Sequence, residues 1–341
     1  MKKLFILSIL VIGFSQLNVA QKSVCKLVNR ISLEGNGRWD YITVDSETNT
    51  AYQSHGDIVQ VVDLSTGRTV GTIGDLSGVH GVAVAREFNK GFISNGRTST
   101  VTVFDLTTFK TLETIKVGGQ NPDAIMYDSF SKLVYTFNGK TLNATVIDPK
   151  TNEIKAIIQL SGKPEFPQSD NKGTIYVNIE DKNEIQVIDS KTLKVVNHWS
   201  IAPGEEPSGL ALDNVNHRLF SVCSNKKMIV SDVQSSKVVA VLPIGSGCDG
   251  VAFDPTLKMA FSANGEGTIT VVKELLKDKF EVVETAKTQP SARTIAVNTK
   301  THHLYLPAAE FNSKPEPTTE NPKPRATMKP GSFTILDVEV K

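Results

Sequence analysis

The sequence predicts an all-β protein, a seven-bladed β-propeller of four-stranded antiparallel blades. A short signature, a mostly apolar pair followed by a residue that is usually acidic, returns seven times along the 341 residues. Its third residue is Asp63, Asp105, Asp148, Asp189, Asp232, Lys273 and Asp337, with steps of 42, 43, 41, 43, 41 and 64 residues. A period of about 40 to 45 residues built from short strands is typical of a β-propeller, in which each repeat is one blade.

The first repeat shows how a blade is built. Residues 41–45, 51–54, 58–63 and 69–73 are short runs rich in β-branched and aromatic residues, and turn formers separate them. The unit is therefore a four-stranded meander with its first strand innermost. The acid that ends each third strand is expected to set the next turn, because its carboxylate can accept hydrogen bonds from backbone amides two or three residues on.

The last repeat lacks a fourth strand of its own. It supplies strands at about 294–297, 303–306 and 333–337, after which the sequence stops at Lys341. The segment 26–33, which precedes the first inner strand, can supply the missing strand. Pairing the two ends would remove the exposed edges of an open arc, so we predict that the ring closes in this way.

The N-terminus predicts export. Residues 1–20 combine a basic start, an apolar run over 4–14 and a small residue at Ala20, which is typical of a secretory signal peptide. A buried strand or a retained anchor is the alternative, but the run is shorter than a membrane span requires. We therefore expect residues 21–341 to form one soluble propeller domain, periplasmic or secreted, with no membrane span.

A proline-rich insert lengthens the last repeat. Residues 308–330 contain five prolines and little apolar surface, so they are expected to form a long loop. This loop is either a flap over the channel mouth or a clamp that packs across neighbouring blades.

Charge argues against a nucleic-acid partner. Without Lys2 and Lys3 the chain has 35 basic and 36 acidic side chains, and the basic residues are not clustered as phosphate-backbone binding requires. We expect a monomer that binds a small molecule or a protein ligand.

Several repeats resemble the YVTN-repeat propellers, the YncE-like family. The second blade reads Gly-Phe-Ile-Ser-Asn at 91–95, Val-Thr-Val-Phe-Asp at 101–105 and Thr-Ile-Lys-Val-Gly at 114–118, and Asn121-Pro122 follows. The resemblance covers about residues 38–341, and departs from the pattern at 163–168 and at Lys273. It implies an exported propeller used mostly as a binding or scaffold module. Fold alone does not choose the chemistry.

One position in each repeat provides candidate site residues. The residues just before the inner strands are Asp40, His80, Asp123, Glu165, Ser208, Asp249 and Arg293. Because the inner strands converge on one axis in the same direction, these side chains are expected to form a ring at one mouth of the channel. The alternative is that each acid only caps its own loop.

A ring of this composition favours a cation. Carboxylates held close together raise one another's pKa unless a cation is present, so we expect either a cationic ligand or a divalent metal bound by Asp123, Asp249 and His80. Oxygen ligands with one imidazole suit Ca²⁺, Mg²⁺ or Mn²⁺, and Zn²⁺ or Fe²⁺ remains open. Arg293 favours internal ion pairs or a ligand with a carboxylate or phosphate group.

A second tier is expected from the loops that follow the second strands. Its members are His55, Asn95, Asn138, Glu180, Asn225, Asn264 and Glu310, and ordinary turn chemistry is the alternative for the asparagines. Cys223 and Cys248 come from adjacent blades near the same mouth. A disulfide between them can form in an oxidising compartment and a soft-metal site is the rival, but the sequence leaves the pairing open.

Two function classes remain open. The first is a binding or scaffold propeller that uses the acidic, His- and Arg-containing mouth. The second is a metal-assisted hydrolase or lyase, such as a lactonase, in which a metal polarises a carbonyl and an acid or His80 acts as base. The sequence contains no nucleophile elbow, zincin motif, dinucleotide fingerprint or covalent haem motif.

Overall fold

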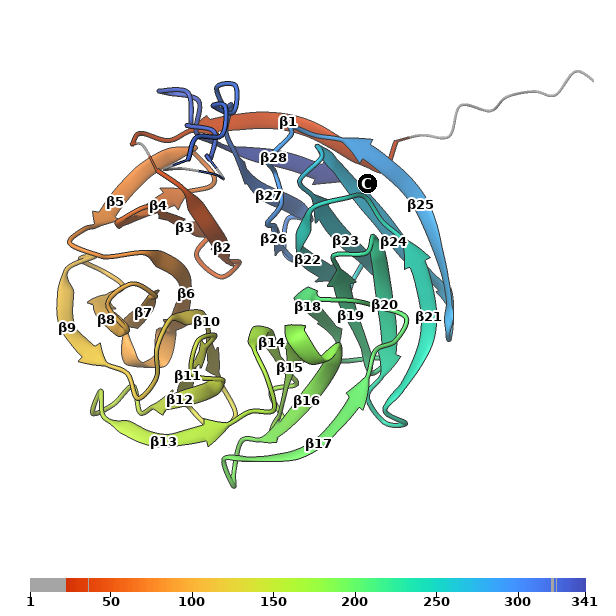
Figure 1. Cartoon of the computed structure of the whole chain (residues 1–341), viewed down its shortest axis with the longest axis horizontal. Helices are drawn as coiled ribbons and strands as arrows, with labels where there is room; N and C mark the ends of the chain where they lie inside the picture. The colour runs from red at the N-terminus through yellow and green to blue at the C-terminus, as the bar shows by residue number, and fades with distance from the viewer. Residues whose placement is uncertain (1–22, 36, 320–321, 323) are drawn as a thin grey trace, which may run out of the picture.

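The computed structural model describes residues 23–35, 37–319, 322 and 324–341. Its strands form seven four-stranded antiparallel sheets around a central axis, which confirms the predicted seven-bladed propeller (Figure 1). The predicted signal peptide, residues 1–20, lies outside the described residues. Among the described residues, no helix has the length and apolar character that crossing a membrane requires.

Six blades follow one another along the chain as simple meanders. Their innermost strands are β2 (Trp39–Asp45), β6 (Val79–Ala85), β10 (Pro122–Asp128), β14 (Pro164–Ser169), β18 (Pro207–Asp213) and β22 (Cys248–Asp254). The second strands are β3 (Thr50–His55), β7 (Lys90–Asn95), β11 (Leu133–Asn138), β15 (Thr174–Ile179), β19 (Arg218–Cys223) and β23 (Met259–Asn264). The third strands are β4 (Ile58–Asp63), β8 (Thr100–Asp105), β12 (Asn143–Ile147), β16 (Glu184–Asp189), β20 (Lys227–Asp232) and β24 (Thr268–Leu276). The outermost strands are β5 (Arg68–Ile73), β9 (Thr111–Lys116), β13 (Ile154–Gln159), β17 (Lys194–Ser200), β21 (Lys237–Pro243) and β25 (Lys279–Lys287).

Two single-turn 3₁₀ helices, η1 (Arg86–Phe88) and η2 (Glu180–Lys182), lie in loops of blades two and four. Both lead into an asparagine with left-handed backbone angles, Asn89 and Asn183, which ends the turn.

The N-terminus closes the seventh blade, as predicted. That blade contains β26 (Ala296–Asn298), β27 (His303–Ala308) and β28 (Thr334–Val340), and β1 (Cys25–Ser32) pairs antiparallel with β28. In Figure 1, β1 lies along the outer side of β28, so the two ends of the chain share one sheet.

The hydrophobic core is divided among the interfaces between neighbouring blades. Seven clusters of buried residues join adjacent pairs of sheets; one example packs Tyr135 and Phe137 of blade three against Val177 and Ile179 of blade four. Each blade therefore buries both faces only when both neighbours are present.

Most of the recurring acids set turns as the sequence predicts, whereas Asp337 lies inside β28 and contacts a histidine of β27. Asp63 accepts a bond from the backbone N–H of Ser65 at 2.8 Å, and Asp189 accepts one from that of Thr192 at 2.7 Å. The hydroxyl and the backbone N–H of Ser65 lower the pKa of Asp63, and the backbone N–H and the hydroxyl of Thr192 lower the pKa of Asp189. Their role is structural, at the ends of third strands.

Blade four keeps its inner strand in spite of its two prolines, Pro164 and Pro167. Strand β14 pairs only with β15, because it is the inner edge of its sheet. A proline can occupy an edge strand, since its missing N–H need not face a neighbour.

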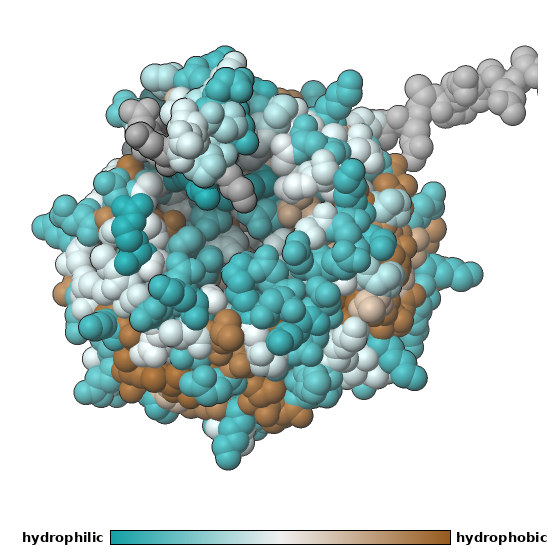
Figure 2. Space-filling model, in the orientation of Figure 1, coloured by the Kyte–Doolittle hydropathy of each residue, from teal (hydrophilic) through white to brown (hydrophobic). Residues whose placement is uncertain are grey.

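The proline-rich insert forms a loop between β27 and β28, as predicted. Phe311 forms an isolated bridge with Met328, and both pack on a cluster that contains Trp39 and Phe333. The insert therefore clamps blades seven and one. In Figure 2 it rises beside a hydrophilic hollow at the centre of this face.

Candidate functional site

Six of the seven ring residues lie inside their inner strands, at β-bulges, whereas Arg293 lies before β26. The sequence placed the ring just before the strands, but β2 begins at Trp39 rather than at Tyr41. Trp39 pairs with His55 and Ile42 pairs with Gln53, so Asp40 and Tyr41 together face the single residue Ser54. Strands β6, β10, β14, β18 and β22 have the same irregularity at their ring residues. A bulge of this kind re-aims a side chain, here toward the channel.

Buried serines stabilise two of these bulges. Ser54 accepts a hydrogen bond from the backbone N–H of Asp40 at 3.2 Å and donates one to the carbonyl of Tyr41 at 2.9 Å. Ser94 accepts a bond from the backbone N–H of Gly81 at 3.0 Å and donates one to the carbonyl of Asp123 at 2.5 Å.

Glycines after the ring residues let the inner strands approach one another. A Cβ on Gly209 would lie 2.9 Å from the Cα of Gly250, and one on Gly250 would lie 3.0 Å from the Cα of Thr294. Side chains here would push blades five, six and seven apart, so these glycines keep the channel narrow.

Five of the ring residues form a continuous chain of contacts around the axis. Arg293 Nε lies 3.2 Å from Asp249 Oδ2, and Arg293 Nη2 lies 3.6 Å from Asp40 Oδ1. His80 Nδ1 lies 2.6 Å from Asp40 Oδ2 and 3.4 Å from Asp123 Oδ1. Side chains from blades six, seven, one, two and three thus meet at one mouth, as the ring hypothesis predicts.

Glu165 is paired with Lys163, a residue that the sequence analysis did not place in the site. Lys163 Nζ lies 2.8 Å from Glu165 Oε1 and also contacts Glu180. Burial alone would lower the pKa of Lys163, but its bonds with the two glutamates raise it. Lys163 lies two residues before Glu165 in the sequence, and this spacing is the signal by which sequence reasoning could have found it. Ser208 completes the ring, and its carbonyl accepts a bond from Asn178 Nδ2 at 3.1 Å.

Burial and neighbouring charges shift the protonation of the ring. Burial raises the pKa of Asp123 to about 6, although the charge of His80 opposes the shift. Burial would lower the pKa of His80, but its hydrogen bond with Asp40 and the charges of Asp123 and Asp40 raise it to about 9. At neutral pH the imidazole is therefore protonated and provides positive charge between two carboxylates.

Tyr41 lies at the centre of this charge pattern. Its ring packs edge-on against Phe166 at 5.2 Å between centroids. Burial, followed by the charges of Asp123, Glu165, Asp40 and Asp249, raises the pKa of the phenol well above its usual value. The sequence analysis treated Tyr41 only as a neighbour of the ring.

The residues that could hold a metal differ from the predicted set. The acceptor atoms of Asp40, His80 and Asp123 lie within 4.8 Å of one another. Asp249, which the sequence analysis placed in the metal set, pairs with Arg293 instead. Asp123 Oδ1 is buried and makes no hydrogen bond with a described residue; His80 Nδ1 faces it at 3.4 Å, so its acceptor capacity is available to a cation that replaces the proton of His80. Two carboxylates and one imidazole suit Mn²⁺ or Zn²⁺.

The second tier does not line the mouth as a group. Asn138 and Asn264 are fully buried, and their amides bond to Thr145 and Thr270 within their own blades, each at 3.0 Å. His55 is 1% exposed and contacts Gln60 at 3.3 Å. These side chains tie strand ends together, and we leave them out of the proposed site.

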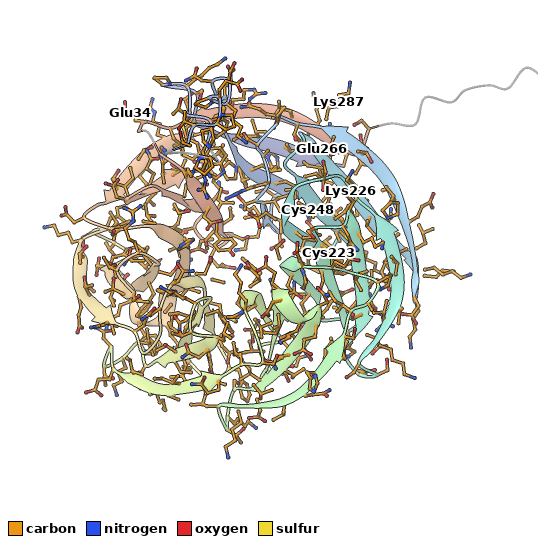
Figure 3. All side chains as sticks on the ribbon, in the orientation of Figure 1. Glu34, Cys223, Lys226, Cys248, Glu266 and Lys287 are labelled. Atoms are coloured by element: carbon orange, nitrogen blue, oxygen red, sulfur yellow. The ribbon has the colours of Figure 1, made fainter. Side chains whose placement is uncertain are left out.

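Cys223 and Cys248 are buried free thiols, so the disulfide that the sequence left open is not formed in this structure. Figure 3 places them on the neighbouring blades five and six. The thiol of Cys248 contacts the carbonyl oxygen of Cys223 at 3.1 Å rather than its sulfur. Burial raises the pKa of each thiol to about 12, which disfavours the thiolates that a soft metal requires.

No family model matches this chain, and no curated protein matches it either. Many solved structures share the fold. One of them, hydrazine synthase from Kuenenia stuttgartiensis, is 18% identical with a TM-score of 0.69, and the match covers 80% of this chain and 94% of that chain. A likeness at this level of identity shows the propeller fold alone.

Proposed function

We propose that the protein is an exported binding or scaffold propeller, of the YVTN-repeat kind, that holds a ligand at the ring mouth of its channel. The observation that carries this proposal is the contact chain Asp249–Arg293–Asp40–His80–Asp123, which brings side chains from five blades to one place. Ionisable groups gathered in a concave site with shifted pKa values are typical of functional sites. Export is supported by the N-terminal sequence pattern.

The ligand of the mouth includes a divalent cation in this proposal. Asp40, His80 and Asp123 are its protein ligands, with Mn²⁺ or Zn²⁺ favoured over the Ca²⁺ and Mg²⁺ that all-oxygen sites prefer. Cation binding would replace the positive charge that His80 supplies between the two carboxylates.

The test is a titration of the mature protein, purified without chelator, with Mn²⁺ and Zn²⁺ by calorimetry. We expect Asp40→Asn and Asp123→Asn to weaken binding at least about tenfold, because each removes a charged ligand. Asp249→Asn is the matched control, since it removes a mouth carboxylate that pairs with Arg293. Wild-type protein that binds neither ion, or three variants with equal losses, would refute the cation site.

A metal-assisted hydrolase of the lactonase kind is the alternative function. In this alternative Asp123 transfers protons and is not a metal ligand: its side chain is 16% exposed, and burial raises its pKa to about 6, which suits proton transfer near neutral pH. His80 suits the role of base less well, because it holds its proton at neutral pH. Lactone hydrolysis by the Mn²⁺-loaded protein would favour the enzyme over the binding module, and its loss in Asp123→Asn at saturating Mn²⁺ would assign the proton transfer to Asp123.

A further inference from the structure

The ring mouth opens into a cavity of about 500 Å³ whose rim is cationic. Arg38, Arg97 and Arg293 line it above Asp40 and His80, and Trp39 forms part of its wall. The floor of the mouth is therefore acidic, whereas its outer rim carries three guanidinium groups and a single carboxylate, that of the exposed Asp57. A ligand that complements both the floor and the rim needs an anionic group beside the three arginines.

Two of these arginines have no partner in the described part of the chain. Arg38 and Arg97 are exposed, and neither makes an ion pair or a side-chain hydrogen bond with a described residue. Arg293 is oriented toward the cavity wall by Asp249 and by the carbonyl of Trp39, which accepts a bond from Arg293 Nη2 at 3.3 Å.

Arg38 lies near two further arginines, and the ion pairs with acids in the mouth go to Arg293 rather than to Arg38 or Arg97. The pKa of Arg38 is lowered by burial and then by the charges of Arg325 and Arg293. The guanidinium group of Arg38 is therefore repelled by those of Arg325 and Arg293. Arg325 belongs to the proline-rich insert, which brings a further positive charge to this side of the mouth. An anion placed among these groups would remove the repulsion.

The backbone leaves room for such an anion. Gly37 and Gly78 line the cavity with φ of +129° and +63°, values that side chains other than glycine disfavour. A Cβ on Gly78 would lie 3.0 Å from the Cβ of Arg97. Glycine at this position therefore lets the Arg97 backbone come close without filling the cavity.

We propose that Arg38, Arg97 and Arg293 bind the carboxylate or phosphate group of a small anionic ligand above the Asp40–His80–Asp123 floor. Guanidinium groups match the paired oxygens of carboxylate and phosphate, and a cluster of them is selective for such groups. The cavity volume limits the ligand to a small molecule. This inference rests on the proposed binding function of the mouth, but it does not require a bound metal.

The test measures anion binding directly. Succinate and inorganic phosphate are titrated into the metal-free mature protein at low ionic strength, and the two probes separate a carboxylate ligand from a phosphate ligand. We expect at least one probe to bind, and both Arg38→Gln and Arg97→Gln to weaken it by about tenfold. Arg68→Gln, which changes an exposed arginine on the outer strand β5, is the matched control and should bind as the wild type does.

The inference is overturned if neither anion binds to the wild type, or if both rim variants bind as well as Arg68→Gln. Melting temperatures of the variants exclude unfolding as a cause, because the exchanged side chains are exposed. The Mn²⁺ titration tests the cation site of Asp40, His80 and Asp123 separately. Mn²⁺ binding without anion binding would refute the rim site alone, and anion binding without Mn²⁺ binding would refute the cation site alone.

Discussion

At the scale of single residues, Glu165 shows how burial competes with pairing in the mouth. Its side chain is 10% exposed, and Lys163 Nζ approaches it to 2.8 Å. Lys163 divides its charge between Glu165 and Glu180, so it compensates the burial of Glu165 only in part. Burial, with the charge of Asp123, raises the pKa of Glu165 from 4.5 to about 8. The folded protein therefore favours the protonated form over a wide pH range.

Glu165→Gln should gain stability relative to the wild type as the pH rises. A carboxyl group whose pKa is higher in the folded state takes up protons on folding, so the wild type loses stability between the unfolded value of 4.5 and about 8. The slope is at most about 1.4 kcal/mol per pH unit for one group. The glutamine variant lacks this loss.

Urea denaturation of both proteins at about pH 5 and about pH 8.5 checks the prediction. Glu153→Gln, which removes an exposed carboxylate from blade three, is the control. A difference between wild type and Glu165→Gln that stays constant or reverses with pH would contradict the assigned shift.

At the scale of the elements, the sequence predicted the strands well and the bulges not at all. Recurring acids and turn formers located the third strands, and β4 has its predicted bounds, 58–63. A bulge adds one residue without breaking the run of strand-forming side chains, so the inner strands looked as if they began after the ring. The buried polar residues opposite the bulges, such as Ser54 and Ser94, were the signal that could have revealed them.

The sequence likewise predicted only part of the candidate site. Equivalent positions in a repeat lie at equivalent places on the converging strands. Sequence alone could therefore predict which residues meet at one mouth: Asp40, His80, Asp123, Asp249 and Arg293. Which of them contact one another depends on side-chain reach. Sequence therefore chose Asp249 for the metal set, whereas the structure pairs it with Arg293 and brings Asp40 to His80.

Ser94→Ala should loosen the bulge that presents His80. The change leaves the buried N–H of Gly81 without its acceptor, which costs about 1–3 kcal/mol. Because the same hydroxyl also bonds to the carbonyl of Asp123, we expect weaker Mn²⁺ binding in addition to lower stability. Ser235→Ala, an exposed serine after β20, is the control. Unchanged stability and Mn²⁺ affinity in Ser94→Ala would show that the bulge holds its shape without the serine.

At the scale of the whole molecule, ring closure and the mouth are coupled. The contact chain crosses the junction between the last blade and the first, where Arg293 meets Asp40 and Thr294 Oγ1 donates to the carbonyl of Asp40 at 2.9 Å. Strand β1 completes the sheet on which blade seven depends, and Ile31 of β1 is buried in the core shared by blades seven and one. The strand that closes the ring thus also stabilises the junction that assembles the site.

A variant that begins at Leu33 should therefore lose both the closed ring and the ligand site. Without β1, strand β28 has an unpaired edge and the buried face of Ile335 loses its neighbour Ile31, so we expect self-association and early unfolding. Relative to a protein that begins at Ser23, light scattering should show oligomers, and calorimetry should show no Mn²⁺ or anion binding. A synthetic peptide of residues 23–33, added in trans, should pair with β28 and restore a monomer that binds ligand. A monomeric truncated protein with full ligand binding would mean that blades seven and one assemble the mouth without the closing strand.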